Sequence, residues 1–344
     1  GRTPRAAQVL NAFLPTRHLL SYLESILRVY NAAGRRDNIY KARIKILLEA
    51  MGISAFAEAV NAEWMALQSS EFDLPIEEQD RILAHFATPN LPPVADGTAA
   101  ALARRQIDAG FDRWLAQNVN PHWHPGYGSP SISLKAIGRP PGDASAAEML
   151  DMADLADRFG RGEMRITYLQ NIIIPHVALV DMPAFYDALC AAGLDGAENG
   201  LIGDMIACPG LDYCNLANAR SLPVADRIFA RFDDPVKRLE IGPVRLNISG
   251  CINACAHHHA ADIGILGVNK KGAEHFQISL GGKAGEAVAV GKILGPSFAE
   301  DDVPDAVGVI IDTYLLKRRQ GEVFAACLDR HGIAPFKEAL YGTG

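Results

Sequence analysis

The chain has 344 residues, of which 49% are hydrophobic and 21% charged, a composition typical of folded globular domains. Its net charge of −7 argues against a nucleic-acid-binding protein, because phosphate contacts need a concentrated basic surface. No apolar run reaches the roughly 18 residues of a membrane span, and no signal peptide is recognisable, so we expect a cytoplasmic protein without a membrane partner. The chain opens at Gly1 without Met, and GRTPRAAQVL reads like the interior of a longer protein, so we expect an amino-terminal part to be missing.

Helical periodicity dominates the first part of the chain. Apolar residues recur at helical spacing over 15–32, and Gly34 ends that helix. A second helix is predicted over 37–52 and a third over 54–67.

The stretch from about 68 to 130 changes character, because it is rich in Pro, Gly and Asn. We predict a connector that carries one helix near 98–116. His122 and His124 form an H-x-H pair that could bind a metal, although an ordinary polar role is the simpler interpretation.

Beyond the connector, strands and helices alternate. The predicted order is a strand over 131–138, a helix over 144–160, a long strand region over 163–177 and a helix over 182–193. This order indicates a ferredoxin-like α+β unit. The remainder mixes predicted strands with helices: strands over 244–249, 262–268 and 275–282, and helices near 216–231 and 303–319.

Six cysteines are present, and nothing indicates secretion, so we expect reduced thiols. Cys190 and Cys327 lie on apolar helical patterns and are predicted to be buried structural thiols. The other four pair by spacing. CPGLDYC is a C-x5-C and CINAC a C-x3-C, and 36 residues separate the two pairs: Cys208 with Cys214, and Cys251 with Cys255.

Four thiolates suit either tetrahedral zinc or an iron–sulfur cluster. Zinc knuckles favour tighter spacings, whereas the sulfurs that hold a cubane are spread around a larger body. The looser spacing therefore favours a cluster, with zinc or unrelated buried thiols as alternatives. Pro209 and Gly210 keep the first loop out of a helix, and Gly250 and Ala254 permit close backbone approach in the second.

Histidines 257–259 follow the last cysteine directly. Three consecutive side chains point in different directions and cannot all bind one ion, so we interpret them as packing residues beside the site.

At CPGLDYCNLANARS and NISGCINACAHHHAADIGILG the sequence resembles the sirohaem-containing nitrite and sulfite reductases. The resemblance implies that Cys208, Cys214, Cys251 and Cys255 hold a [4Fe-4S] cluster. It also implies that Cys255 bridges the cluster to the iron of sirohaem. GEMRITYLQNIII is similar to the family's second ferredoxin-like half, and residues 18–52 are similar to the helical end of its first half.

The fold implied by the resemblance is α+β, with a ferredoxin-like half-domain and a mixed α/β domain, forming the second half of a pseudo-duplicated reductase. The expected organisation is the helical end of the first half (1–67), a connector (68–128), the ferredoxin-like half-domain (129–196) and the [4Fe-4S] and sirohaem domain (197–344).

The segment GRRDNIYKARIK is rich in cations, and such a run is most simply a solvated helix surface. Sirohaem, however, carries many carboxylates that need fixed cations, and in the family this segment faces the macrocycle. Lys41 and Lys45, four apart, are expected to share a helix face. The candidate carboxylate partners are Arg36, Lys41, Arg43 and Lys45, with Lys45 favoured, and Asn253 is a further candidate neighbour of the macrocycle.

The resemblance implies an enzyme that reduces sulfite to sulfide by six electrons in assimilatory sulfur metabolism, with nitrite to ammonia as the alternative. No nucleotide-binding fingerprint is recognisable, so electrons are expected from a ferredoxin or a flavoprotein. In the family a preceding half supplies most basic residues of the anion pocket, so these 344 residues are not expected to catalyse alone. Two other classes stay open, a zinc-stabilised binding module and a cluster-only electron carrier, and the cationic segment argues against both.

Overall fold

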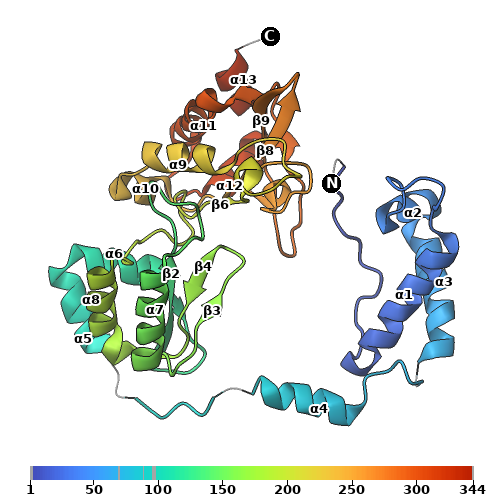
Figure 1. Ribbon diagram of the computed structural model, residues 1–344, viewed down its shortest axis with the longest axis horizontal. Helices are drawn as coiled ribbons and strands as arrows, with labels where there is room; N and C mark the ends of the chain where they lie inside the picture. Colours follow the sequence, from blue (N-terminus) through green and yellow to red (C-terminus); the bar gives the residue numbers. More distant parts are fainter. Residues whose placement is uncertain (1–2, 69, 88, 95–97, 343–344) are drawn as a thin grey trace. The chain divides into compact units, whose positions relative to one another are not determined.

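The computed structural model describes residues 3–68, 70–87, 89–94 and 98–342. These residues form two compact units, one comprising Arg5–Asn90 and the other beginning at Leu91 (Figure 1). Both helices and sheets are present, which confirms the predicted α+β class. Within the described ranges, no helix combines the length and apolar character needed to cross a membrane.

The unit Arg5–Asn90 is helical. Its elements are η1 (Thr16–His18), α1 (Leu19–Ala33), α2 (Ile44–Met51), α3 (Ile53–Leu67) and α4 (Ile76–His85). Helix α1 packs along α3. The buried core between them is small and consists of Tyr22, Leu47, Phe56 and Val60.

The second predicted helix is shorter than expected, because α2 begins at Ile44 rather than near residue 37. Asn38 forms a turn instead: its side chain accepts from the Tyr40 N–H at 2.9 Å, and its carbonyl accepts from the Lys41 N–H at 2.9 Å. Asn favours such turns because its side chain bonds to nearby backbone. Lys41 therefore precedes the helix, and the prediction that it shares a helix face with Lys45 is wrong.

The second unit starts with the ferredoxin-like half-domain, whose strands form an antiparallel sheet in the order β1-β2-β4-β3, with β5 also paired to β2. The elements in chain order are α5 (Thr98–Ile107), α6 (Ala109–Asn118), β1 (Val119–Pro121), β2 (Tyr127–Ser133), α7 (Ala146–Phe159), β3 (Arg165–Ile166), β4 (Asn171–Ile173), β5 (Val177–Ala178), η2 (Leu179–Asp181) and α8 (Met182–Ala192). Its buried core joins Leu155 of α7 and Phe185 of α8 to Ile132 of β2.

Two predicted elements of this half-domain are interrupted. The connector helix is two helices, because the Asp108 carboxylate caps α6 by accepting from the Phe111 N–H at 3.0 Å. The long strand region over 163–177 breaks at Thr167–Gln170, where the Gln170 N–H donates to the Thr167 carbonyl at 3.1 Å. Gln170 has φ +59°, which a continuous strand does not allow.

The rest of the second unit is built on a six-stranded sheet of order β10-β9-β8-β7-β6, with β11 also paired to β9. Its elements are β6 (Ile206–Ala207), η3 (Gly210–Asp212), α9 (Leu222–Arg231), α10 (Pro235–Ile241), β7 (Leu246–Ser249), η4 (His258–Ala260), β8 (Ile263–Lys270), β9 (Ala273–Leu280), β10 (Lys292–Ile293), β11 (Phe298–Ala299), η5 (Glu300–Asp302), α11 (Val303–Lys317), α12 (Phe324–His331) and α13 (Ala334–Tyr341).

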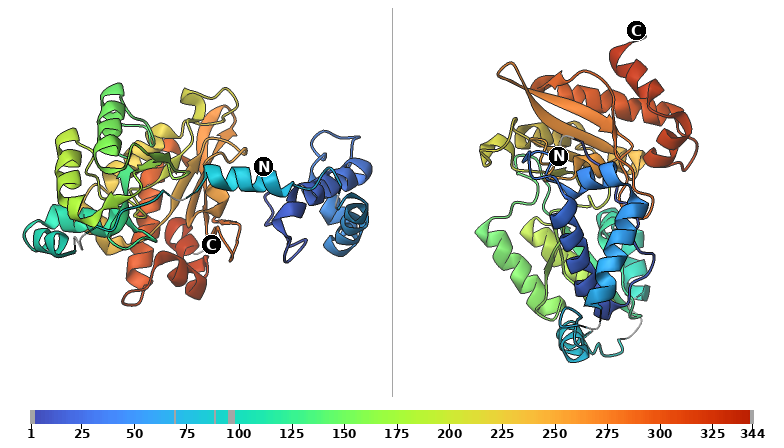
Figure 2. Two further views of the ribbon diagram at one scale, coloured as in Figure 1. Left: turned by 90° about the horizontal axis from the view of Figure 1, so that it is seen from below. Right: turned by 90° about the vertical axis from the view of Figure 1, so that its right-hand side faces the viewer.

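Strands β6, β7 and β8 run parallel to one another, whereas β9 pairs with β8 in the antiparallel sense (orange in Figure 2). The sheet is covered by α11, which contacts α9, α12 and α13 and shares one buried core with the strands. Ile310 of α11 and Ile265 of β8 are both 0% exposed in that core. The sheet thus gives rigid support to the loops at its ends.

Candidate metal centre

The two cysteine loops leave the same edge of the six-stranded sheet. Cys208 directly follows β6, and Cys251 follows β7 after one intervening residue, Gly250. Because β6 and β7 are parallel neighbours, with Ala207 opposite Ile248, their carboxyl ends lie side by side. The Cys208 N–H continues this pairing by donating to the Ile248 carbonyl at 3.0 Å. The topology thus brings together two motifs that are far apart in the sequence.

The two loops also contact each other directly. A Cβ added at Gly250 would lie 2.6 Å from the Ala219 carbonyl oxygen and 3.0 Å from the Gly210 Cα, so only glycine fits there. The N–H groups of Asn218 and Ala219 donate to the Gly250 carbonyl at 2.8 and 3.1 Å. This contact explains why α9 starts at Leu222 and not near residue 216: the chain after Cys214 is bound to the second loop.

The sulfur of Cys208 accepts a backbone hydrogen bond. The Gly250 N–H donates to Cys208 Sγ at 3.0 Å, and the Ser221 hydroxyl lies 3.5 Å from the same sulfur. Backbone donors aimed at a thiolate are the environment that an iron–sulfur centre needs, because they stabilise its negative charge. The sequence predicted the close approach at Gly250 but gave no sign of Ser221.

The second loop holds two residues in the left-handed region, Ala254 with φ +58° and His257 with φ +55°. Each costs about 1–2 kcal/mol for a residue with a Cβ. The turn is closed by the Ala254 N–H, which donates to the Cys251 carbonyl at 3.2 Å, and Asn247 of β7 donates to the Ala256 carbonyl at 2.7 Å. Strain retained in this way is typical of functional loops.

The four cysteines differ in exposure. Cys251 is buried, Cys208 and Cys214 are half-buried, and Cys255 is exposed. Cys255 lines a mainly apolar cavity of about 350 Å³. The cavity wall comes from the domain of the six-stranded sheet at Asn247 and Ala256 and from the half-domain at Leu169. Cys255 is therefore the cysteine with space beside it for a further group.

In the described part of the chain, no three His, Cys, Asp or Glu side chains converge on a single metal-ion position. A [4Fe-4S] cluster does not require its ligands to converge on one point. Each of its four irons binds its own thiolate, so the four cysteines surround a larger body. The residues present fit such a group on two observations: the adjacent cysteine loops, and a buried histidine, His258, whose ring nitrogens have no hydrogen-bond partner among the described residues.

The histidines after Cys255 have different environments. His258 is buried, which lowers its pKa to about 3, and its ring contacts that of His259 in a tilted arrangement with centroids 3.8 Å apart. His257 is exposed.

The H-x-H pair in the connector has protein partners. His122 Nε2 lies 2.8 Å from His176 Nδ1, and His122 Nδ1 accepts from the His124 N–H at 2.8 Å.

The candidate sirohaem partners other than Asn253 lie in the unit Arg5–Asn90. Arg36 stacks over the Tyr30 ring at 4.8 Å and donates to Asn31 Oδ1 at 3.0 Å. Lys41 and Arg43 are exposed in the segment before α2, and Lys45 is half-buried in its first turn. Asn253 is exposed in the second cysteine loop.

The remaining cysteines differ from each other. Cys327 is 0% exposed and confirms the prediction of a buried thiol. The same prediction for Cys190 is wrong, because Cys190 is exposed. The buried face of α8 is formed by Met182, Phe185 and Leu189, and Cys190 follows one position beyond that face.

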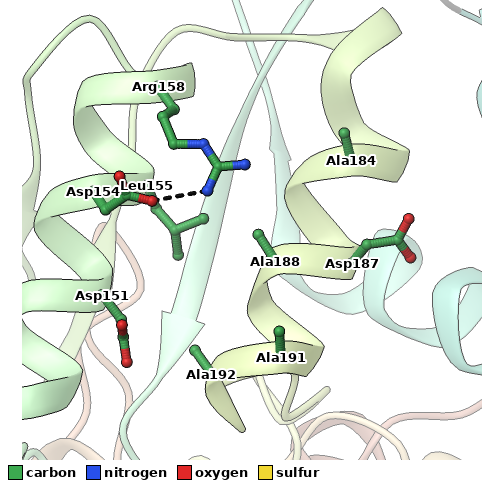
Figure 3. A pocket seen from close by; sticks show the side chains of 9 residues that line it. All are labelled: Asp151, Asp154, Leu155, Arg158, Ala184, Asp187, Ala188, Ala191 and Ala192. Atoms are coloured by element: carbon green, nitrogen blue, oxygen red, sulfur yellow. Dashed lines mark hydrogen bonds and ion pairs between the residues drawn. The ribbon is translucent and has the colours of Figure 1, made fainter.

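A second cavity, of about 550 Å³, lies between α7 and α8 (Figure 3). Alanines of α8, among them Ala188, face α7, where Arg158 and Asp154 form an ion pair of 2.8 Å. Its lining contains no cysteine, so we do not assign it to the metal centre.

Comparison with known proteins agrees with this geometry. The nitrite and sulphite reductase 4Fe-4S domain matches residues 1–66 and 203–343, and the nitrite/sulfite reductase ferredoxin-like half domain matches residues 137–192. The first match alone covers more than half of the chain, and the chain therefore belongs to the nitrite and sulfite reductase family. The cofactors expected from the sequence, a [4Fe-4S] cluster and sirohaem, are those of this family.

Relatives with either substrate in their names are similar to the chain. A ferredoxin–nitrite reductase of Synechococcus elongatus is 27% identical over 307 residues, which cover 87% of this chain and 51% of that protein. A sulfite reductase [ferredoxin] of Mycobacterium tuberculosis is 26% identical over 337 residues, which cover 94% of this chain and 53% of that protein. The chain thus spans about half the length of the curated relatives it matches.

Solved structures show the same fold. The NirA protein of Mycobacterium tuberculosis superimposes with a TM-score of 0.69 at 23% identity, over 97% of this chain and 56% of that one. A dissimilatory sulfite reductase I superimposes with a TM-score of 0.53 at 11% identity, over 79% of this chain and 91% of that one.

Proposed function

We propose that Cys208, Cys214, Cys251 and Cys255 bind a [4Fe-4S] cluster and that Cys255 is also the axial ligand of sirohaem. In the complete protein this centre reduces sulfite to sulfide by six electrons, in assimilatory sulfur metabolism. The observation that carries the proposal is the adjacency of β6 and β7, which delivers both cysteine pairs to one sheet edge with their loops in contact.

The bound cofactors supply the redox chemistry, since no amino-acid side chain can store the electrons. The chain supplies the environment. The Gly250 N–H stabilises negative charge on Cys208 Sγ, and hydrogen bonds of this kind tune the potential of a cluster. The left-handed turn at Ala254 orients Cys255 relative to Cys251. The mainly apolar cavity beside Cys255 leaves space next to its sulfur for a bound group.

Cations of the unit Arg5–Asn90 are proposed to bind the carboxylates of sirohaem. Lys41, Arg43 and Lys45 are the main candidates: Lys41 and Arg43 are exposed just before α2, and Lys45 lies half-buried in its first turn. Arg36 belongs to the same proposal, although its guanidinium also stacks on Tyr30. Asn253 is proposed as a neutral neighbour of the macrocycle from the cysteine loop itself.

Nitrite is the second candidate substrate, since similar relatives carry the name of either reductase. Ferredoxin is the proposed electron donor, because it appears in the names of both. A flavoprotein donor and a cytoplasmic location remain predictions from the sequence. Steady-state rates of the complete protein with reduced ferredoxin, and with sulfite or nitrite in turn, decide the substrate: a higher kcat/KM for nitrite would overturn the first choice.

The test of the centre is a visible absorption spectrum with iron and acid-labile sulfide content, on protein purified without oxygen from cells that make sirohaem. We expect four cluster irons with matching sulfide and tetrapyrrole bands. Cys208→Ser is expected to lose cluster iron, whereas Cys190→Ser, a matched control at an exposed cysteine outside the centre, is expected to keep it. Colourless protein that contains zinc would overturn the proposal.

A further inference from the structure

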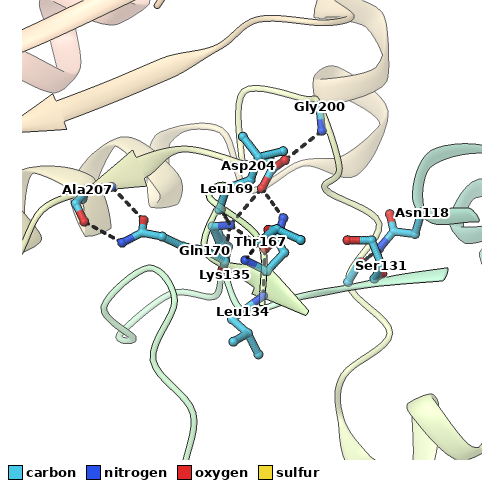
Figure 4. Close-up of polar contacts among 12 residues, drawn as sticks. Asn118, Ser131, Leu134, Lys135, Thr167, Leu169, Gln170, Gly200, Asp204 and Ala207 are labelled. Carbon is cyan, nitrogen blue, oxygen red and sulfur yellow. Dashed lines mark hydrogen bonds and ion pairs between the residues drawn. The ribbon is translucent and has the colours of Figure 1, made fainter. Parts of the chain in front are cut away.

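The edge of the six-stranded sheet next to the first cysteine is completed by a side chain from the other domain. β6 has only two residues and is the terminal strand, so its outer side has no strand partner in the described part of the chain. The amide of Gln170 takes that place: its Nε2 donates to the Ala207 carbonyl at 2.9 Å, and its Oε1 accepts from the Ala207 N–H at 3.1 Å (Figure 4). Ala207 is 1% exposed, so water cannot replace these bonds.

The residue held in this way directly precedes Cys208. Backbone groups alternate along a strand, so the Ala207 groups point outward to Gln170 while the Cys208 N–H points inward to the Ile248 carbonyl, at 3.0 Å. Cys208 is therefore positioned from two sides, by the sheet and by the half-domain. The side chain of Gln170 makes this contact from the half-domain, outside the domain of the six-stranded sheet.

Gln170 is itself fixed in an unfavourable backbone conformation, with φ +59°. Gly142 makes room for its stem, because a Cβ at Gly142 would lie 2.8 Å from the Gln170 Cβ. Two carbonyls of its turn are bound by a buried cation: Lys135 Nζ donates to the Leu169 carbonyl at 2.6 Å and to the Gln170 carbonyl at 3.1 Å. A left-handed glutamine persists only where its surroundings over-determine it.

The same lysine connects to the segment that leads into β6. Lys135 Nζ lies 2.9 Å from Asp204 Oδ1, and the two side chains are only 1% and 3% exposed. Asn171 Nδ2 also donates to Asp204 Oδ1, at 2.8 Å, and the Gly200 N–H donates to Asp204 Oδ2 at 3.0 Å (Figure 4). Every partner is satisfied, which is the condition for a buried ion pair to specify one arrangement.

We propose that Gln170 is a positioning residue for the metal centre: through Ala207 it fixes the place of Cys208, with the Lys135–Asp204 ion pair holding both sides of the contact. The inference rests on the cluster proposed above. Gln170 acts through the backbone of the neighbouring residue and is not a catalytic residue. The half-domain thereby contributes to the geometry of a site whose four ligands all lie in the other domain.

The experiment compares Gln170→Ala with Asn120→Ala in the whole chain carrying its cluster. Asn120 is the matched control, because its side chain also donates to a backbone carbonyl in the half-domain, that of Ser129 at 3.0 Å. Both variants lose side-chain bonds to the backbone, so unfolding alone does not separate them. The readouts are amide hydrogen exchange at residues 206–208, the EPR spectrum of the reduced cluster and the rate of iron loss to a chelator.

For Gln170→Ala we expect about tenfold faster exchange at these amides, because both hydrogen bonds to Ala207 are lost, with an altered EPR spectrum and faster iron loss. For Asn120→Ala we expect none of these changes. Gln170→Glu fills the same volume and keeps an acceptor for the Ala207 N–H, but it replaces the donor to the Ala207 carbonyl by an oxygen that repels it. It is therefore expected to show the same changes as the alanine variant, and it serves as the test if the alanine variant does not fold.

Wild-type exchange, EPR and iron retention in Gln170→Ala would overturn the inference, as would equal changes in Asn120→Ala. A wild-type chain without cluster iron would instead overturn the proposed function. The exchange comparison would then still decide whether Gln170 holds the strand, so the two failures are distinguishable.

Discussion

Two three-helix segments of the chain follow the same local pattern but bury different amounts of their surface. α1 and α11 both have 15 residues, and α2 and α12 both have eight. Both segments then continue with G-I-x-x-F-x-E-A, from Gly52 in one and Gly332 in the other. The phenylalanine of each motif is buried, with Phe56 at 2% and Phe336 at 0% exposure.

The difference lies in the first helix. α11 packs against the six-stranded sheet and buries Val307, Ile310 and Ile311 completely. α1 belongs to a unit whose described residues form no sheet, and its leucines keep about half of their surface exposed, from 46% at Leu23 to 54% at Leu27. Equal helix lengths and equal turn residues therefore do not imply equal burial. The local sequence specifies the helices, and the neighbouring element decides which face becomes core.

The largest expected contrast is between truncations in the two first helices. Ile310→Ala removes a fully buried side chain and leaves a cavity, so we expect its unit to lose about 2–5 kcal/mol of unfolding free energy. Leu23→Ala, at 46% exposure, is expected to cost about 0.5 kcal/mol or less. Chemical denaturation of each variant measures both values. Similar losses would mean that α1 is buried to the same extent as α11.

Substituting the glycine that begins each G-I-x-x-F-x-E-A motif is expected to lower the stability to unfolding by a smaller amount, equal in both segments. Gly52 has φ +83° and ψ 152°, and Gly332 has φ +68° and ψ −172°, a region that is essentially restricted to glycine. An added Cβ would meet nothing within 4 Å at either position, so backbone strain is the whole cost. Gly52→Ala and Gly332→Ala should each cost about 1–3 kcal/mol in thermal unfolding. A loss at only one glycine would break the equivalence of the two turns.

The smallest effect concerns one acid–base pair in each segment. Arg35 and Asp37 lie between α1 and α2, whereas Glu322 precedes α12 and its partner Arg330 lies in the last turn of that helix. A hydrogen bond from Arg330 lowers the pKa of Glu322 to about 2, and a hydrogen bond from Arg35 lowers the pKa of Asp37. For Glu322 the stabilising contribution is complete above about pH 4.5 and is lost as the pH falls toward 2. Carboxyl NMR titration should show the pKa of Glu322 rising in Arg330→Gln while that of Asp37 stays unchanged. An unchanged pKa of Glu322 would contradict the assigned cause.

The sequence predicted much of the fold where local signals are strong. The helices α3, α7, α8 and α11 lie where apolar periodicity placed them. It failed where side chains compete with helix or strand formation: Asn38 turns the chain before α2, and Gln170 breaks the strand region after Thr167. Such turns depend on hydrogen bonds of individual polar side chains. A pattern of apolar residues over a whole segment does not register these single residues.

For the candidate site, the sequence predicted four cysteine ligands from their spacing and surroundings, and their binding of a cluster stays a prediction. It did not identify Ser221 or Gln170, because neither carries a metal-binding atom or a motif. A polar Gln-Asn pair inside the apolar run YLQNIIIP was the one signal available for Gln170, since polar residues at buried strand positions need specific partners.

By itself the sequence determined the chemistry: the number, type and spacing of the thiols, and the glycine at residue 250 that lets two loops approach. The tertiary structure alone decided the placement. Two cysteine pairs with 36 residues between them become neighbours only because β6 and β7 pair in parallel, and the strand that leads to Cys208 is completed by a glutamine from another domain. Hydrogen-bond partners between strands and between domains are chosen by the packing of the whole unit, and no local pattern in the sequence encodes that choice.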